Sequence, residues 1–172
     1  VAAYTPMNIY KAKMAKWSLV RKELHDSLSL CNWMGPVSAS PLKERGYRGD
    51  DSLESLLYSL ATGDKKSRTE LDLAAERIFL LHRALTIRGL GQRQIRTVHD
   101  TIPEWVFSDR SGRPPFTAGT IHMDREDIRK GMDMFYQELD WDLSTGLPGR
   151  EAYKKAGLSD VAAELAKQGL LP

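Results

Sequence analysis

Apolar residues recur at helical spacing along most of the chain, and no stretch of five or more residues alternates convincingly as a strand would. In residues 8–24 they recur at mostly helical spacing among basic residues: Ile9, Ala12, Met14, Ala15, Leu19 and Val20. The strongest helical pattern covers residues 69–89, where one face is expected to consist of Leu71, Ala74, Ala75, Ile78, Leu81, His82 and Leu85. The spacing predicts an all-α protein.

Start and stop signals bound these helices. Asp51, followed three residues later by Glu54, resembles a capping box that opens the helix in "SLESLLYSLATG", and Gly63 is suited to end that helix. The long helix has start and end signals of its own, at Thr69, Asp72 and Gly89.

The C-terminal third continues the helical pattern. A helix is expected to start at Asp124 and to have on its inner side Ile128, Met132, Phe135, Tyr136 and Leu139. Two short helices follow in "GREAYKKAG" and "SDVAAELAKQG", each ended by a glycine. Long loops are predicted around residues 36–50 and 92–120, and loops of that length in a compact domain suggest surfaces that lie against something else. The fold class is therefore an irregular all-α domain with long loops.

Length and charge narrow the class of protein further. The 172 residues suffice for about one domain, which we assign to residues 1–172. Because the chain starts at Val1, without a capping signal before its first helix, we expect it to be a fragment of a longer polypeptide. Its 25 basic and 23 acidic side chains are mixed along the sequence, which gives no footprint for nucleic acid or a membrane surface. No apolar run approaches the roughly 20 residues of a membrane span. We therefore expect a cytoplasmic protein.

The single cysteine, Cys31, stands in "HDSLSLC", residues 25–31, and its residue type allows several interpretations. A lone cysteine in a helical domain is by default a small buried apolar residue. A nucleophile–base pair with His25 is disfavoured, because six residues do not place the two on one helical face and no oxyanion-stabilising group is evident. A zinc site lacks ligands at suitable spacing, and His82 is interpreted as a hydrogen-bonded core residue. Only the stretch from Asp26 to Cys31 supports a specific chemical hypothesis.

That stretch begins a resemblance that extends over nearly the whole chain. "DSLSLC" resembles the D-x-x-G-L-C motif in the C-terminal region of the aldehyde:ferredoxin oxidoreductase family, the tungsten- or molybdenum-pterin enzymes. "TELDLAAERIFLLHRALTIR" is similar to the family's helix with an E-R-I…R-A…R pattern, and "HDTIPEWVF" to its D-D-x-x-P-E-R-F segment. "MDMFYQELDWDLSTGLPGREAYKKAGLSDVAAEL" is similar to the family's closing run. Each motif is weak alone, whereas four in the right order are fairly specific.

The resemblance implies a role for the "HDSLSLC" stretch. In the family, this cysteine is the fourth ligand of a [4Fe-4S] cluster, and the other three ligands come from an earlier part of the parent chain. Carried over, Cys31 is that metal ligand, Asp26 hydrogen-bonds the tungsten (or molybdenum) bis-pterin, and Leu30 places a main-chain group near the pterin. The implied activity is oxidation of an aldehyde to a carboxylic acid, with electrons passed to ferredoxin or an electron-transfer subunit. The catalytic residues are expected upstream of this chain.

Two positions depart from the family pattern. Ser29 stands where the family usually has glycine, so either the backbone there does not need a positive φ or the turn differs. Trp105 replaces the arginine that usually follows the glutamate of the D-D-x-x-P-E-R-F segment. Substrate loops vary within the family, so a benzoyl-CoA-reductase-like member is an alternative. A non-catalytic helical interaction module remains the second function class.

Overall fold

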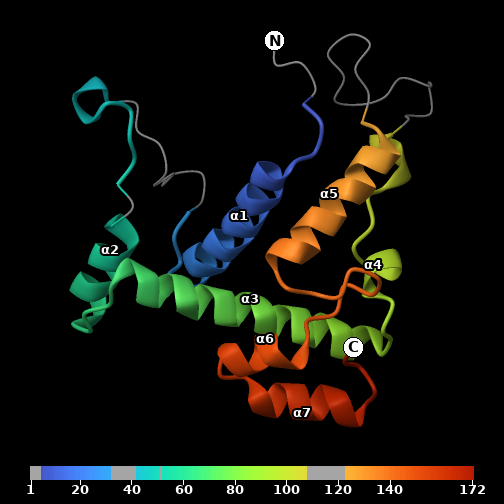
Figure 1. The fold of residues 1–172 in the computed structure, drawn as a ribbon. Helices are drawn as coiled ribbons and strands as arrows, with labels where there is room; N and C mark the ends of the chain where they lie inside the picture. The colour runs from blue at the N-terminus through green and yellow to red at the C-terminus, as the bar shows by residue number, and fades with distance from the viewer. Residues whose placement is uncertain (1–4, 32–41, 51, 108–122) are drawn as a thin grey trace. The chain divides into compact units, whose positions relative to one another are not determined.

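The computed structural model describes residues 5–31, 42–50, 52–107 and 123–172. The all-α prediction is confirmed: among these residues there is no strand, only an isolated antiparallel bridge between Trp141 and Pro148. Figure 1 shows the helices and the irregular segments that connect them. In chain order the elements are α1 (Ile9–Ser27), η1 (Lys43–Arg45), α2 (Leu53–Thr62), α3 (Arg68–Leu90), α4 (Ile95–Val98), η2 (Glu104–Val106), α5 (Arg125–Glu138), α6 (Arg150–Lys155) and α7 (Ser159–Lys167).

The chain divides into two compact units. One unit comprises Ser18–His82, and the other comprises Val1–Trp17 together with Arg83–Pro172. Both divisions fall inside helices, since α1 and α3 each contribute residues to both units. The assignment of residues 1–172 to one domain stays a prediction.

The Ser18–His82 unit has a small apolar core between α1 and α3. It consists of Val20, Leu24, Leu71 and Ala75, against which pack the partly buried side chains of Leu28, Tyr58 and Phe79. Leu28 lies just beyond the end of α1. The core therefore reaches the segment in which the sequence predicts cofactor ligands.

In the other unit, the C-terminal helices surround fully buried aromatic and aliphatic side chains, among them Tyr136, Leu147, Tyr153 and Leu165. At the start of the unit, the backbone N–H of Met7 donates to both carboxylate oxygens of Asp127 in the first turn of α5, at 3.1 and 3.0 Å. Gly131, one turn further along α5, permits this approach, because a Cβ there would lie 2.8 Å from Cγ of Met7. A side chain at position 131 would therefore push the two segments apart.

The buried face of α3 differs from the one predicted. Leu71 and Ala75 are buried as expected, but the pattern then changes sides. The buried positions of the second half lie roughly opposite on the helix: Leu80, Ala84 and Ile87. The prediction assumed one buried face throughout, whereas α3 contributes to two units. His82 is consequently exposed rather than part of the core, and its Nδ1 lies 2.9 Å from Oε1 of Glu23.

The helix-end predictions are partly confirmed. Asp124 caps α5 by accepting from the N–H of Asp127, and Gly63 ends α2 with φ 75°. The helix α3 starts earlier than the sequence predicts: the capping box is formed by Ser67 and Glu70, with Ser67 N–H donating to Glu70 Oε2 at 2.8 Å and Glu70 N–H to Ser67 Oγ at 3.3 Å. The same helix also ends later than the sequence predicts, since Gly91, not Gly89, has the positive φ. Asp51 lies outside the described residues.

Candidate cofactor-binding turn and the buried polar networks

The predicted site residues lie on and just after the C-terminal end of α1, where the chain forms a Schellman turn. The N–H of Leu30 donates to the carbonyl of His25 at 2.8 Å, and the N–H of Ser29 donates to the carbonyl of Asp26 at 3.2 Å. Ser29 itself has φ 56°. The left-handed conformation that glycine favours is therefore present here despite the serine. Of the two alternatives for Ser29, a backbone without a positive φ is excluded, and the turn of the motif is formed by a serine.

Asp26 is on the last turn of α1, with its side chain exposed. Its carboxylate accepts from Nζ of Lys22, one turn earlier on the same helix. An ion pair this exposed contributes little free energy, because water solvates both groups nearly as well. The carboxylate of Asp26 is thus available to a partner that brings better-placed hydrogen-bond donors.

Leu30 and Cys31 follow the turn. The N–H of Leu30 is engaged within the turn, so its carbonyl is the main-chain group that remains for a contact outside it. Cys31 is a free thiol at the surface. The interpretation of Cys31 as a buried apolar residue is therefore wrong, because its side chain is exposed.

A buried ionic cluster joins α1 to α2 behind this turn. His25 Nε2 lies 2.6 Å from Oε1 of Glu54, and the two side chains are only 5% and 2% exposed. Oε2 of Glu54 accepts from Arg21 at 2.8 Å, and Arg21 also contacts Oδ1 of Asp72 on α3 at 3.0 Å. The predicted capping role of Glu54 is replaced by a buried ion pair, since its side chain points at α1 rather than back along α2.

A second polar network lies in the other unit and joins three segments on which the family resemblance rests. Arg83 of α3 binds Asp100 with both guanidinium arms, NH1 to Oδ1 at 2.8 Å and NH2 to Oδ2 at 2.5 Å. The same NH2 donates to the carbonyl of Gly146 at 2.6 Å. The Tyr136 hydroxyl donates to Oδ2 of Asp100 at 2.6 Å. Residues of the long-helix, "HDTIPEW" and closing motifs thus meet around one guanidinium.

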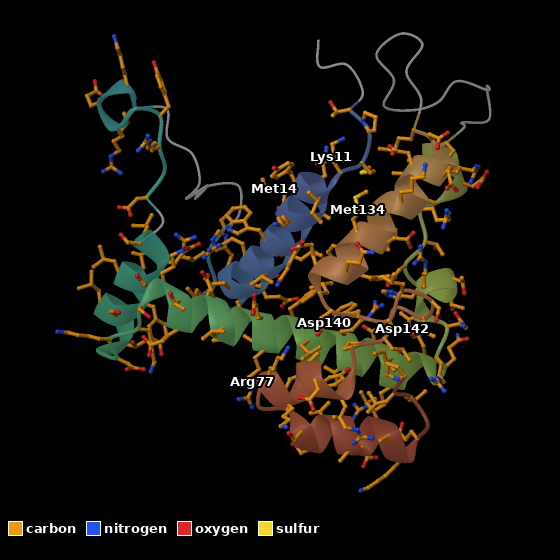
Figure 2. The ribbon with its side chains drawn as sticks, viewed as in Figure 1. Lys11, Met14, Arg77, Met134, Asp140 and Asp142 are labelled. Atoms are coloured by element: carbon orange, nitrogen blue, oxygen red, sulfur yellow. The ribbon has the colours of Figure 1, made fainter. Side chains whose placement is uncertain are left out.

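The segment after α5 is shaped to close this network. Its Trp141 ring lies under the Arg83 guanidinium, 4.7 Å from ring centroid to Cζ. Asp142, labelled in Figure 2 on this segment, accepts on one carboxylate oxygen from the backbone and side chains of Ser144 and Thr145, which fixes a tight turn. Gly146 follows with φ 74°, and a Cβ there would lie 2.8 Å from NH2 of Arg83. Only glycine fits at this position.

These contacts and burial shift the pKa values of Asp100, Tyr136 and Tyr153. Burial disfavours the charged form of Asp100, but hydrogen bonds from Arg83, His99 and Tyr136 outweigh it and hold the pKa of Asp100 below its usual range. Burial, together with the hydrogen bond to Asp100, raises the pKa of the Tyr136 hydroxyl. Burial also raises the pKa of Tyr153 to about 12. At neutral pH the network therefore holds one carboxylate, one guanidinium and neutral phenols.

Two groups at this network have no hydrogen-bond partner in the described residues: the buried Nε of Arg83 and the buried hydroxyl of Tyr153. The described residues also contain no group of three or more histidine, cysteine, aspartate or glutamate side chains arranged to hold a metal ion. Within the same part of the chain, none of the helices has the length and apolarity needed to cross a membrane.

The fold and the turn define an α-helical protein that presents a carboxylate and a thiol within six residues in one unit and contains a polar network in the other. Residues 2–158 match the family model described as aldehyde ferredoxin oxidoreductase, domains 2 and 3. The chain belongs to the aldehyde ferredoxin oxidoreductase family. No solved structure matches it.

Sequence reasoning missed Glu54, Arg21, Arg83 and Asp100 as members of the two networks. For Arg83 and Asp100 a signal existed, since both stand in motifs of the family. For Glu54 the nearest signal was its apparent capping position, which indicated a different role. Both networks join residues far apart in the chain, and periodicity detects only neighbours on one helix.

Proposed function

We propose that this chain supplies one ligand of a [4Fe-4S] cluster and part of a bis-pterin site in a tungsten- or molybdenum-dependent oxidoreductase that oxidises aldehydes and passes electrons to ferredoxin. The turn at the end of α1 is the observation that carries the proposal. It places an exposed carboxylate and an exposed thiol on one short, hydrogen-bonded segment.

Cys31 fits a cluster shared with another part of the protein. Cluster iron is held by four thiolates, and this chain has a single cysteine. The remaining three ligands would come from another part of the enzyme. An exposed thiol directly after a rigid turn is able to bind such a cluster without reorganising the helix.

Asp26 fits a hydrogen-bonding role toward the pterin. A carboxylate accepts two parallel N–H bonds from an aminopyrimidine edge with the geometry it uses toward a guanidinium. The exposed pair with Lys22 is easily exchanged for such an edge. The carbonyl of Leu30 is the main-chain acceptor at the same turn, because its N–H is used by His25.

The overall reaction is RCHO + H₂O → RCOOH + 2 H⁺ + 2 e⁻. The bound metal would supply the two-electron redox chemistry and the cluster would pass electrons on singly. The contribution of this chain is positional: Asp26 orients the pterin, Cys31 holds the cluster, and only four residues lie between the two. A short covalent path of this kind fixes the spacing between electron donor and acceptor.

The test is metal analysis of the enzyme that contains this chain, with two variants compared with the wild type. Cys31→Ala removes a cluster ligand, so iron content or the cluster potential should change while tungsten or molybdenum is retained. Asp26→Ala deletes hydrogen bonds to the pterin at a cost of roughly 1–3 kcal/mol if its donors stay buried and unpaired, so pterin and metal should be lost more readily while iron stays.

Wild-type content of both metals and wild-type activity in both variants would falsify the proposal and favour a non-catalytic helical module. Retained metals with turnover of an aryl-CoA thioester instead of an aldehyde would indicate the benzoyl-CoA-reductase-like alternative.

A further inference from the structure

We propose that Glu54 is a positioning residue for the cofactor-binding turn, acting through His25. This inference deepens the function proposed above and rests on it for its relevance to the cluster. The evidence is a chain of short contacts from α2 through the end of α1 to Leu30.

The first contact joins two buried side chains. Oε1 of Glu54 lies 2.6 Å from Nε2 of His25, and Oε2 accepts from Arg21 at 2.8 Å. A carboxylate bridging two nitrogen donors is held at both oxygens, so its position is fixed by two charge-assisted contacts. The other arm of the arginine contacts Oδ1 of Asp72 at 3.0 Å, which ties Arg21 to α3 as well as to α2.

The second contact is made by the backbone of the same histidine. The carbonyl of His25 accepts the N–H of Leu30 at 2.8 Å, the longest-range hydrogen bond of the turn. Fixing the side chain of His25 therefore fixes the residue whose carbonyl closes the turn. Cys31 follows Leu30 directly.

Among the described residues, the turn also has an apolar contact and a surface ion pair. Leu28 packs against the apolar core formed by Val20, Leu24, Leu71 and Ala75. The side chain of Asp26 is exposed, and its pair with Lys22 lies at the surface. Ser29 occupies a left-handed conformation that costs a serine free energy, so the turn needs compensating contacts. The buried contact between Glu54 and His25 is one such compensating contact.

Mutation of a residue that orients a metal ligand typically costs about ten- to a hundredfold in metal affinity or activity. If Glu54 loses its charge, His25 loses a charge-assisted partner and the carbonyl that closes the turn is less restrained. The thiolate that follows then samples more positions. The expected consequences are a less firmly held cluster and an altered cluster potential, with the fold of the unit retained.

The experiment uses the complete enzyme with its cofactors, in the variants Glu54→Gln and His25→Phe. Iron release to a chelator should be about tenfold faster in each, as is typical when a supporting contact of a metal ligand is removed. The midpoint potential of the cluster should shift with the same sign in both. The double variant should show no further change, since both substitutions break one chain of contacts.

A matched control is available on the same helix. Glu23→Gln breaks another carboxylate–histidine pair, the one with His82, but that histidine is exposed and does not close the turn. Iron release and potential should stay at wild-type values. If Glu54→Gln does not fold, His25→Phe carries the test, because Arg21 remains as a partner for Glu54.

A second readout is independent of the cluster. In the same variants, amide hydrogen exchange of Leu30 should be about tenfold faster, because its acceptor carbonyl is less firmly held. Unchanged exchange at Leu30, together with unchanged iron release, would overturn the positioning role even where Cys31→Ala loses cluster iron. Faster exchange in an enzyme whose Cys31→Ala variant retains its iron would support the positioning role and remove the proposed cluster ligand.

Discussion

Ser29 has a backbone conformation that glycine adopts more readily than serine. Its φ of 56° is in the left-handed region, where an L side chain crowds its own backbone. The turn is nevertheless formed with both of its hydrogen bonds. Position 29 thus combines a backbone conformation typical of glycine with a serine side chain. Replacing this serine by glycine should therefore change the free energy of unfolding.

We expect Ser29→Gly to stabilise the protein by about 0.5–1 kcal/mol, the relief of left-handed strain less the greater freedom of glycine in the unfolded chain. Urea unfolding measures the change. Ser27→Gly is the control, because Ser27 is the last residue of α1 and glycine there should cost about 0.5–1 kcal/mol. A loss of stability in both variants would contradict the prediction.

Asp100 predicts a pH dependence of stability. Its pKa is lowered in the folded protein, so the unfolded chain binds more protons than the folded one around and below the ordinary value of 3.8. The stabilisation that Asp100 contributes to the folded state is fully present above pH 3.8. It is lost as the pH falls through the lower pKa of Asp100 in the folded protein. Other carboxylates with lowered pKa values, such as Asp142, contribute with the same sign.

A variant isolates the contribution of Asp100. His99→Ala removes one of its hydrogen bonds, from Nδ1 at 2.7 Å, without removing Arg83 or Tyr136. The folded pKa of Asp100 should then rise toward its ordinary value, and the acid loss of stability should be smaller and end at a higher pH. Unfolding free energies measured from pH 5 downward would test this, and identical acid limbs in variant and wild type would contradict it.

At the scale of the element, α3 shows what sequence patterns determine and what they leave open. Its existence and approximate extent follow from the helical spacing in residues 69–89, which falls one residue short of Arg68–Leu90 at each end. Its buried face does not, because Leu71 and Ala75 lie on one side while Leu80, Ala84 and Ile87 lie on the other. A stripe drawn along one face assigned His82 to the core, although the buried polar residue of this turn is its neighbour Arg83.

The start of α3 gives a test of the capping assignment. Ser67→Ala should cost about 1 kcal/mol, because it deletes the hydroxyl that accepts the N–H of Glu70. Thr69→Ala, at the position that the sequence pattern favoured, should change stability by less than about 0.5 kcal/mol, because Thr69 lies inside the helix. Thermal unfolding of both variants distinguishes the two assignments, and a larger loss at Thr69 would restore the sequence-based one.

For the whole molecule, the all-α class, the cap at Asp124 and the glycine end of α2 could be predicted from the sequence, because each depends on residues close together in the chain. The turn residues Asp26, Leu30 and Cys31 were found through a family motif. The partners that hold that turn were not, since Glu54 lies 29 residues from His25 and 33 from Arg21. Local spacing contains no signal for such pairs.

The boundaries between the two compact units fall inside helices, at residues 17–18 in α1 and at residues 82–83 in α3. Genetic recombination exchanges protein modules most readily where a loop can be cut and rejoined. Here, transferring either unit to another protein would sever two helices and remove the hydrogen bonds that cross each cut. The turn that presents Asp26 and Cys31 is therefore expected to be inherited together with both units, as a single block of the gene.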